Sequence, residues 1–243
     1  MITSRSNELI KLVLKLKEKK YSKDNALCVV ESIKLVTELY MKGYVETILV
    51  TENKLNIVSK FENARIEVIS SDLANYITDA VSTDGVVAIC RIPESKNVKY
   101  HRCLVLDRIQ DPSNMGAIIR SAKAFGFETI FTIDSVYPYT FKTIRASMGF
   151  VFGVNIIDVD LKDLMRIKSE NNITFLTADM NGISVEKISK INNNLAIIIG
   201  NEGSGVSDKL EQMSDKAIAI PMSNEVESLN ASVSAGIIMY LLK

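Results

Sequence analysis

Short apolar runs that alternate with helical patterns are the feature of this sequence that most restricts its fold. In the second half of the chain, the runs CLVLD, TIFTID, LAIIIG and AIAIP alternate with segments of helical pattern such as MGAIIRSAKAFGF and LKDLMRIKSE. Strands that read as continuous apolar runs are buried on both faces, which is typical of parallel sheets covered by helices on both sides. The sequence therefore predicts an α/β fold with a mainly parallel sheet.

The first 95 residues show the same alternation on a smaller scale. They begin with a predicted helix from about Ser6 to Lys20 and continue through apolar runs such as ALCVV, YVETILVT and GVVAICRI. The polar segment from Pro93 to Lys99 then interrupts the pattern, as linkers between domains do. We therefore predict two domains, residues 1–95 and residues 102–243.

The short apolar runs and the polar N-terminus argue against a membrane protein. No apolar run approaches the ~18–20 residues of a membrane span, and the N-terminus MITSRSNELIK lacks the apolar segment of a secretory signal. We therefore expect no membrane association and a cytoplasmic protein.

The cysteines and the histidine argue against a metal centre. Cys28, Cys90 and Cys103 are odd in number, far apart and without a C-x-x-C pair, which disfavours both a disulfide framework and a zinc site. We expect buried, reduced thiols. His101 is the only histidine, and its place just ahead of an apolar run predicts that it lies at the surface. No metal is predicted.

The stretch IIIGNEGSGVS has glycines at the spacing of a phosphate-binding loop. Gly200, Gly205 and Ser207 fit the pattern G-x-x-x-x-G-K-[ST], but Val206 stands at the lysine position. Glu202 would in addition place an anion where the phosphates lie, and like charges repel. A nucleotide hydrolase is therefore disfavoured, and the glycines must serve another ligand.

Three polar clusters follow predicted strands, where ligands bind in parallel sheets. They lie at residues 107–114, 200–203 and 220–230. Together they offer backbone amides, small residues and an arginine, but no His–Ser pair and no phosphate-loop lysine. This inventory suits binding and positioning of a substrate better than covalent catalysis.

Residues in or near the first and third clusters also have a purely structural interpretation. Asn114 could be a helix N-cap and Arg120 a solvent-facing arginine, and Ser228 could be the N-cap of the last helix. Asn230 falls in the first turn of that helix with no evident structural need. The residues expected to bury this helix against the core are Val233, Gly236, Ile237, Tyr240 and Leu241.

Basic residues gather at the N-terminus although the net charge is zero. Residues 1–23 contain seven lysines and arginines against Glu8 and Glu18, namely Arg5, Lys11, Lys15, Lys17, Lys19, Lys20 and Lys23. The cluster is either a solvated helix face or a patch that contacts phosphates, and charge alone leaves both open.

Three ordered motifs resemble those of the SpoU/TrmH ribose 2′-O-methyltransferases of the SPOUT class. They are DPSNMGAIIRSAKAFG from Asp111, IIIGNEGSGVS from Ile197 and IPMSNEVESLNASVSA from Ile220, each after a predicted strand. The resemblance covers residues 102–243 strongly. Residues 1–95 are similar, more loosely, to the small ribosomal-protein-like α/β domain that binds RNA in many members, although Ser32 replaces a glycine common in relatives.

The resemblance implies a fold, a cofactor and an assembly. The C-terminal SPOUT domain is expected to end in a trefoil knot, to bind S-adenosyl-L-methionine in that knot and to form a homodimer. Small residues of the last helix, Ala231, Ser232, Ser234 and Ala235, favour such a dimer. The cofactor-binding residues implied by the resemblance are Gly200, Ile220, Leu229, Thr177 and Met222.

The resemblance also implies a catalytic set. Its members are Asn114, Arg120, Glu202, Ser228 and Asn230. A guanidinium stays protonated and is a poor base, so we expect Arg120 to hold a phosphate beside the target ribose and leave the proton acceptor open. Glu202, Ser228 and Asn230 are expected to hold the loop and orient the ribose.

These inferences predict an RNA ribose 2′-O-methyltransferase that uses S-adenosylmethionine. The separate N-terminal domain favours structured ribosomal RNA as the substrate over transfer RNA. The alternatives are a transfer RNA ribose methyltransferase and a non-catalytic RNA-binding or ribosome-assembly protein that retains the methyltransferase fold.

Overall fold

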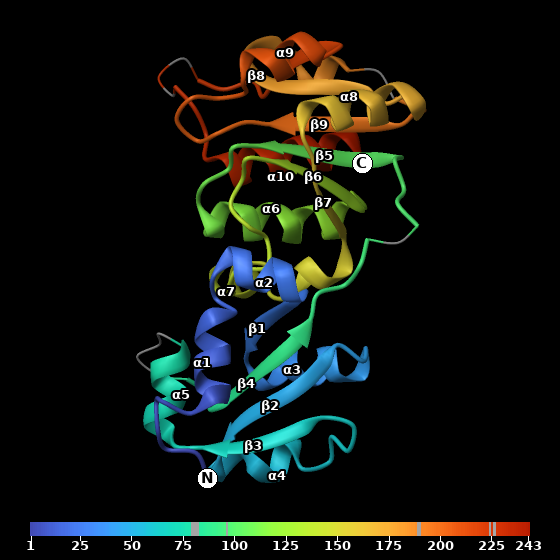
Figure 1. Cartoon of the computed structure of the whole chain (residues 1–243). Coiled ribbons are helices and arrows are strands. Elements are labelled where there is room, and N and C mark those ends of the chain that lie inside the picture. Colours follow the sequence, from blue (N-terminus) through green and yellow to red (C-terminus); the bar gives the residue numbers. More distant parts are fainter. Residues whose placement is uncertain (79–82, 96, 189–190, 224, 226) are drawn as a thin grey trace. The chain divides into compact units, whose positions relative to one another are not determined.

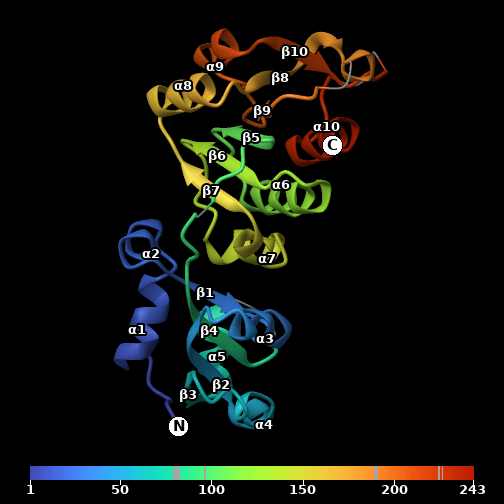
Figure 2. The same cartoon turned by 90° about the vertical axis from the view of Figure 1, so that its right-hand side faces the viewer.

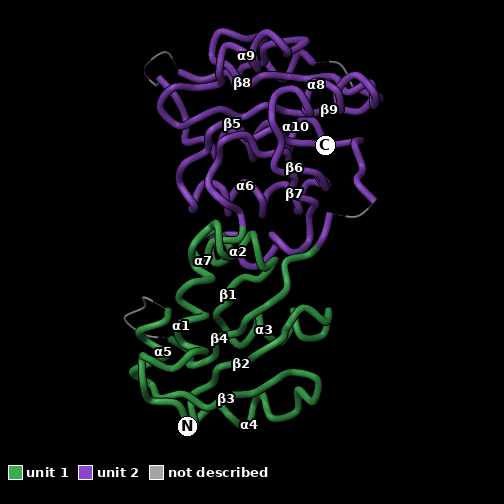
Figure 3. Tube along the Cα trace, viewed as in Figure 1, with its two compact units in different colours: residues 1–93, 139–145 green, residues 94–138, 146–243 purple. Residues whose placement is uncertain are grey.

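The chain forms two compact units. The computed structural model describes residues 1–78, 83–95, 97–188, 191–223, 225 and 227–243. The first unit contains Met1–Pro93 together with Tyr139–Arg145, and the second contains Glu94–Pro138 and Ala146–Lys243 (Figure 3). The segment 139–145 was not expected in the first unit. Residues 93–99, the predicted linker, carry no helix or strand where they are described.

The first unit is built on a mixed four-stranded sheet with the order β1-β4-β2-β3. The strands are β1 (Leu27–Glu31), β2 (Val45–Thr51), β3 (Arg65–Ile69) and β4 (Val86–Arg91). Strand β4 runs antiparallel to both β1 and β2, whereas β2 and β3 are parallel. This small domain is therefore α/β as predicted, but its sheet is not mainly parallel.

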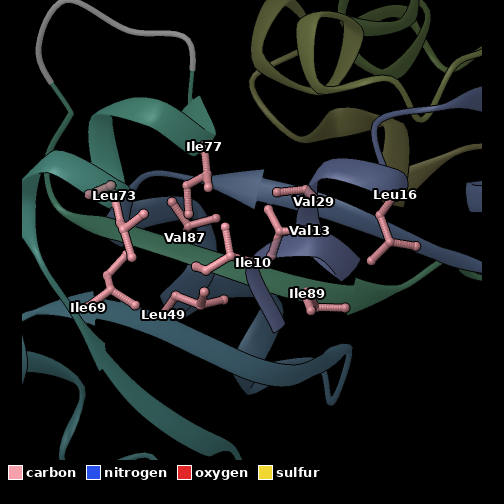
Figure 4. Packing of buried hydrophobic residues seen from close by; sticks show 11 residues of the cluster. Ile10, Val13, Leu16, Val29, Leu49, Ile69, Leu73, Ile77, Val87 and Ile89 are labelled. Atoms are coloured by element: carbon pink, nitrogen blue, oxygen red, sulfur yellow. The ribbon is translucent and has the colours of Figure 1, made fainter. Parts of the chain in front are cut away.

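Helices cover both faces of this sheet. They are α1 (Glu8–Lys15), α2 (Lys19–Asn25), α3 (Ile33–Met41), η1 (Glu52–Lys54), α4 (Leu55–Val58) and α5 (Ser71–Thr78). Ile10 of α1 and Leu73 of α5 pack with Val87 of β4 in one buried cluster (Figure 4). The single helix expected from Ser6 to Lys20 is two helices, because the chain turns at Leu16, whose side chain is buried in the same core.

Ser32 holds a backbone conformation that suits glycine. It lies just before α3 and has a φ of 93° and a ψ of 125°. The backbone amide of Ile33, the first residue of α3, donates to Asp84 Oδ2 (2.7 Å). A residue with a Cβ is strained at positive φ. Because the serine side chain makes no capping hydrogen bond to α3, glycine would lose little there.

We therefore expect Ser32→Gly to raise the free energy of unfolding of the first unit by about 1 kcal/mol. The measurement is thermal and urea unfolding of both proteins. Ser169→Gly is the control, because Ser169 is exposed within a helix of the second unit, where glycine should destabilise. A lower Tm for Ser32→Gly would mean that the serine is not strained.

The second unit is built on a six-stranded parallel sheet with the order β10-β8-β9-β5-β6-β7. The strands are β5 (Arg102–Asp107), β6 (Thr129–Ile133), β7 (Asn155–Asp158), β8 (Thr174–Ser184), β9 (Leu195–Ile199) and β10 (Lys216–Ala219). Every neighbouring pair in this sheet is parallel. The predicted parallel sheet is confirmed, whereas the trefoil knot stays a prediction.

Helices also cover both faces of the parallel sheet. They are α6 (Pro112–Phe125), η2 (Phe150–Gly153), α8 (Leu161–Glu170), η3 (Val185–Lys187), α9 (Asp208–Met213) and α10 (Ala231–Leu242), while α7 (Phe141–Ala146) lies almost wholly in the first unit. Helices α8 and α9 lie on one face, and α6 and α10 lie on the other (Figures 1 and 2). Leu164 of α8 and Leu210 of α9 pack with Phe131 and Val105 in the core.

The final helix buries a different face from the one predicted. Val233, Tyr240 and Leu241 are 48%, 56% and 44% exposed. The buried residues of α10 are Ala231, Ala235, Ile238 and Met239. Small side chains let α10 approach α6 closely, and a Cβ on Gly236 would lie 3.7 Å from Ser121 Oγ. The small-residue face is thus partly used within the chain, and an apolar stripe faces outward.

The cysteines and the histidine lie where they were predicted. All three cysteines are buried and unpaired, and burial raises the pKa of the Cys103 thiol to about 12. His101 is exposed. The described helices include none long and apolar enough to cross a membrane.

Candidate functional site

The three polar clusters meet at one edge of the parallel sheet. Strands β5 and β9 are neighbours, and their carboxyl ends lead into residues 108–111 and 200–207. Strands β6 and β7 continue the sheet on the side of β5, whereas β8 and β10 lie beyond β9. The direction in which successive strands are added to the sheet therefore reverses between β5 and β9. Ligands bind at such a point in open parallel sheets.

Asn114 is buried and is not a helix cap. Asp111 is the N-cap of α6, where its Oδ1 accepts from the amide of Ser113 (2.9 Å), and Pro112 is the first helical residue. Asn114 therefore lies inside the first turn, with 6% of its surface exposed. Its side-chain amide is free of any capping role and can serve the site.

A chain of hydrogen bonds joins three of the predicted catalytic residues. Asn114 Nδ2 donates to Glu202 Oε1 (2.9 Å), and Asn230 Nδ2 donates to Asn114 Oδ1 (2.9 Å). Asn230 is also the N-cap of α10, because its Oδ1 accepts from the amide of Ser232 (2.9 Å). The expectation that Asn230 has no structural need was wrong, and so was the interpretation of Ser228 as this cap.

The carboxylate of Glu202 is stabilised in its ionised form. Burial acts to raise its pKa, but hydrogen bonds from Asn114 and from backbone amides, including those of Gln110 and Asp111, outweigh it and lower the pKa below its usual value. A carboxylate held in this way is a weak proton acceptor near neutral pH. Glu202 is suited to orienting Asn114.

The loop that carries Glu202 is tightly folded. Asn201 and Gly205 exchange backbone hydrogen bonds (2.9 and 3.0 Å), and Asn201 Oδ1 accepts from the amides of Gly203 and Ser204 (both 3.0 Å). A Cβ on Gly200 would overlap the backbone of Gly205. Sequence reasoning did not single out Asn201, although an asparagine between glycines is a known signal for such a turn.

A cavity of about 340 Å³ opens beside this loop. Four predicted cofactor-binding residues line it, namely Gly200, Ile220, Met222 and Leu229, as do the predicted catalytic residues Glu202 and Ser228. Strand β8 adds Ala178, Asp179 and Met180, which were not predicted although Thr177 of the same strand was. Residues 224 and 226 of the third motif lie outside the described residues.

Thr177, the fifth predicted cofactor-binding residue, does not line this cavity. It precedes Ala178 in β8 and is 2% exposed. Its Oγ1 is buried and has no hydrogen-bond partner among the described residues. Leaving a buried hydroxyl without a hydrogen bond costs about 1–3 kcal/mol. The hydroxyl of Thr177 is therefore suited to a hydrogen bond with a polar atom of a ligand.

Arg120 stands apart from the other candidates. It is exposed on α6, six residues after Asn114, which places it about 9 Å further along the helix axis. No hydrogen bond in the described part of the chain joins it to Asn114, Glu202, Ser228 or Asn230. The described residues also contain no group of three His, Cys, Asp or Glu side chains placed to hold a metal ion.

Comparisons with known proteins relate both parts of the chain to RNA methylation. Residues 101–240 match the SpoU rRNA Methylase family, and residues 7–88 match the MRM3-like substrate binding domain. A solved structure, the AdoMet-bound rRNA methyltransferase from Sinorhizobium meliloti, has a TM-score of 0.90 at 24% identity and covers 99% of this chain and 95% of its own. At that identity it shows a common fold.

Two curated relatives are similar at 30% identity. One is the 23S rRNA (guanosine(2553)-2'-O)-methyltransferase RlmP of Bacillus subtilis, matched over 100% of this chain and 98% of its own length. The other is the 23S rRNA (guanosine-2'-O-)-methyltransferase RlmB of Neisseria meningitidis, matched over 85% and 86%. Because the family match spans more than half of the chain and a relative is matched over the whole of it, this protein belongs to the SpoU rRNA methylase family.

Proposed function

We propose that this protein transfers a methyl group from S-adenosylmethionine to a ribose 2′-hydroxyl of ribosomal RNA in the cytoplasm. Family membership supports the reaction, and the names of both curated relatives support a guanosine of 23S rRNA as the substrate. The observation that carries the proposal is the chain of hydrogen bonds from Asn230 through Asn114 to Glu202, the last of which lines the cavity.

The cavity suits the cofactor. Its volume lies within the range of about 300–1,000 Å³ that is usual for ligand pockets, and its lining combines apolar side chains such as Ile220 and Leu229 with carboxylates such as Asp179. Gly200 lets the loop close on itself beside the cavity, and the unpaired hydroxyl of Thr177 is a candidate partner for the cofactor. When bound, S-adenosylmethionine supplies an electrophilic methyl group on a sulfonium.

The chain supplies alignment for this transfer. Asn114, Glu202 and Asn230 are joined by hydrogen bonds, and Glu202 and Ser228 line the cavity, so polar groups there can orient a ribose. Arg120 is exposed and uncommitted to the other candidates, which suits contact with a phosphate next to that ribose. The lowered pKa of Glu202 argues against that carboxylate as the proton acceptor.

Methyl-labelled S-adenosylmethionine tests this function directly. The purified protein should label an unmodified 23S rRNA transcript at a ribose, and S-adenosylhomocysteine should inhibit the labelling. Label on transfer RNA alone would support the transfer RNA alternative. Absence of label from every cellular RNA would favour the non-catalytic RNA-binding protein and overturn the proposal.

We further propose that the protein is a homodimer that buries the outward stripe of α10. Val233, Tyr240 and Leu241 are all at least 44% exposed, and exposed apolar stripes of this kind mark interaction surfaces.

Leu241→Glu should convert the dimer to a monomer in light scattering coupled to size exclusion, because it places a charge in the contact. Met165→Glu is the control, since Met165 is 58% exposed on α8, on the opposite face of the sheet. A wild-type monomer would contradict the proposal.

A further inference from the structure

A second and larger cavity lies on the other side of the Gly200–Ser207 loop. Its volume is about 1080 Å³, and it opens at the carboxyl ends of β5, β6 and β7. Ser204 and Val206 line both this cavity and the cofactor cavity, so the loop is a wall shared by the two. None of the predicted catalytic or cofactor-binding residues lines the second cavity.

The shared wall is fixed by an ion pair between a buried carboxylate and a partly exposed arginine. Asp107 is 1% exposed, and its two oxygens accept from Arg108 Nε and Nη2 (both 3.3 Å). Arg108 Nη2 also donates to the carbonyl of Gly205 (3.1 Å), and the amide of Ser207 donates to Asp107 Oδ2 (2.7 Å). These contacts hold the guanidinium plane at the cavity wall with part of its side chain exposed.

The remaining charges of the cavity favour a ligand with N–H donors. Lys162 and Lys209 are the cations beyond Arg108, and they face a larger number of carboxylates. These are Asp134, Asp158, Asp160 and Asp208. A free phosphate would meet net repulsion here. A nucleobase carries no charge, offers N–H groups to carboxylates and stacks on a guanidinium plane.

We propose that this cavity binds an unstacked nucleobase of the RNA substrate, with Asp134 accepting from the N–H edge of the base and Arg108 stacking on its ring. Guanine suits the site best, because its neighbouring N1–H and N2–H groups can donate to one carboxylate together. The inference rests on the proposed function and deepens it, because it names a cavity next to the cofactor cavity that would recognise a base of the RNA substrate.

Asp134 allows a mild test. It is exposed and has a φ of 46°, a conformation that asparagine adopts readily, so Asp134→Asn removes the charge with little effect on the backbone. Glu170→Gln is the matched control, because Glu170 is exposed at the carboxyl end of α8 and lines neither cavity.

The experiment is an NMR titration of the full chain with guanosine and with uridine, which carry no phosphate, in saturating S-adenosylhomocysteine so that neither nucleoside enters the cofactor cavity. We expect guanosine to bind about tenfold more tightly than uridine, and Asp134→Asn to weaken guanosine binding about tenfold while Glu170→Gln leaves it unchanged. Equal binding of both nucleosides, no binding, or an unaffected Asp134→Asn would overturn the proposal. The same samples report whether S-adenosylhomocysteine binds, so failure of this cavity is distinguishable from failure of the proposed function.

Discussion

Arg120→Ala should lower the single-turnover rate constant of methyl transfer about 10²- to 10³-fold while leaving the affinity for S-adenosylhomocysteine unchanged. Arg120 is exposed on α6, lines neither cavity and has no hydrogen bond to the other catalytic candidates among the described residues. Its loss therefore removes no contact that shapes the cofactor site. A guanidinium that grips a phosphate beside the target ribose aligns the hydroxyl with the methyl group, and alignment is most of what this reaction requires.

The measurements are single-turnover methylation of 23S rRNA and calorimetric titration with S-adenosylhomocysteine. Lys123→Ala is the control, because Lys123 is another exposed cation of α6, and its side chain lies along Gly153, with Cε 3.5 Å from the position of a Cβ there. The methylation rate of Arg120→Lys should lie between those of the wild type and Arg120→Ala, since lysine keeps the charge but cannot form a bidentate contact. If Arg120→Ala abolished cofactor binding, the role assigned to Arg120 would be wrong.

The parallel sheet was predictable from local patterns, whereas the face of α10 was not. LKDLMRIKSE has one apolar stripe, and it forms α8 over the residues expected. Helix α10 is apolar on two sides, so periodicity could not decide which side faces α6, and close packing by Ala231 and Ala235 decided it. Helix α9 was missed because six residues, Asp208–Met213, are too few for a periodic signal.

The candidate site was predictable only in part, for a similar reason. Asn114, Glu202 and Asn230 were identified from motifs, but the bonds that join them span 88 and 116 residues of sequence and follow from strand order. Asp107 and Arg108 belong to the first predicted polar cluster, but no role was predicted for either, because an acidic and a basic residue after a strand are common. Their contacts with Ser207 and Gly205 appear only when β5 lies beside β9.

Leu229→Arg should weaken binding of S-adenosylhomocysteine at least about 100-fold, which is close to 3 kcal/mol. Leu229 lines the cofactor cavity and is only partly buried, so the folded state can accept a larger side chain there. The arginine side chain would occupy part of a cavity of about 340 Å³ and exclude the ligand from that space. Isothermal titration calorimetry measures the loss, and Met165→Arg, on the exposed surface of α8, is the control.

Gly200→Ala separates the shape of the loop from the space in the cavity. A Cβ at this position would overlap the backbone of Gly205 and Val206, so the loop must open and Asn201 must lose its paired hydrogen bonds. Binding should weaken in this variant although the cavity gains no charge. If both Leu229→Arg and Gly200→Ala bound S-adenosylhomocysteine normally, the cofactor would lie elsewhere. If only Leu229→Arg lost binding, the site would tolerate an open loop, and the volume that the arginine occupies in the cavity would govern affinity.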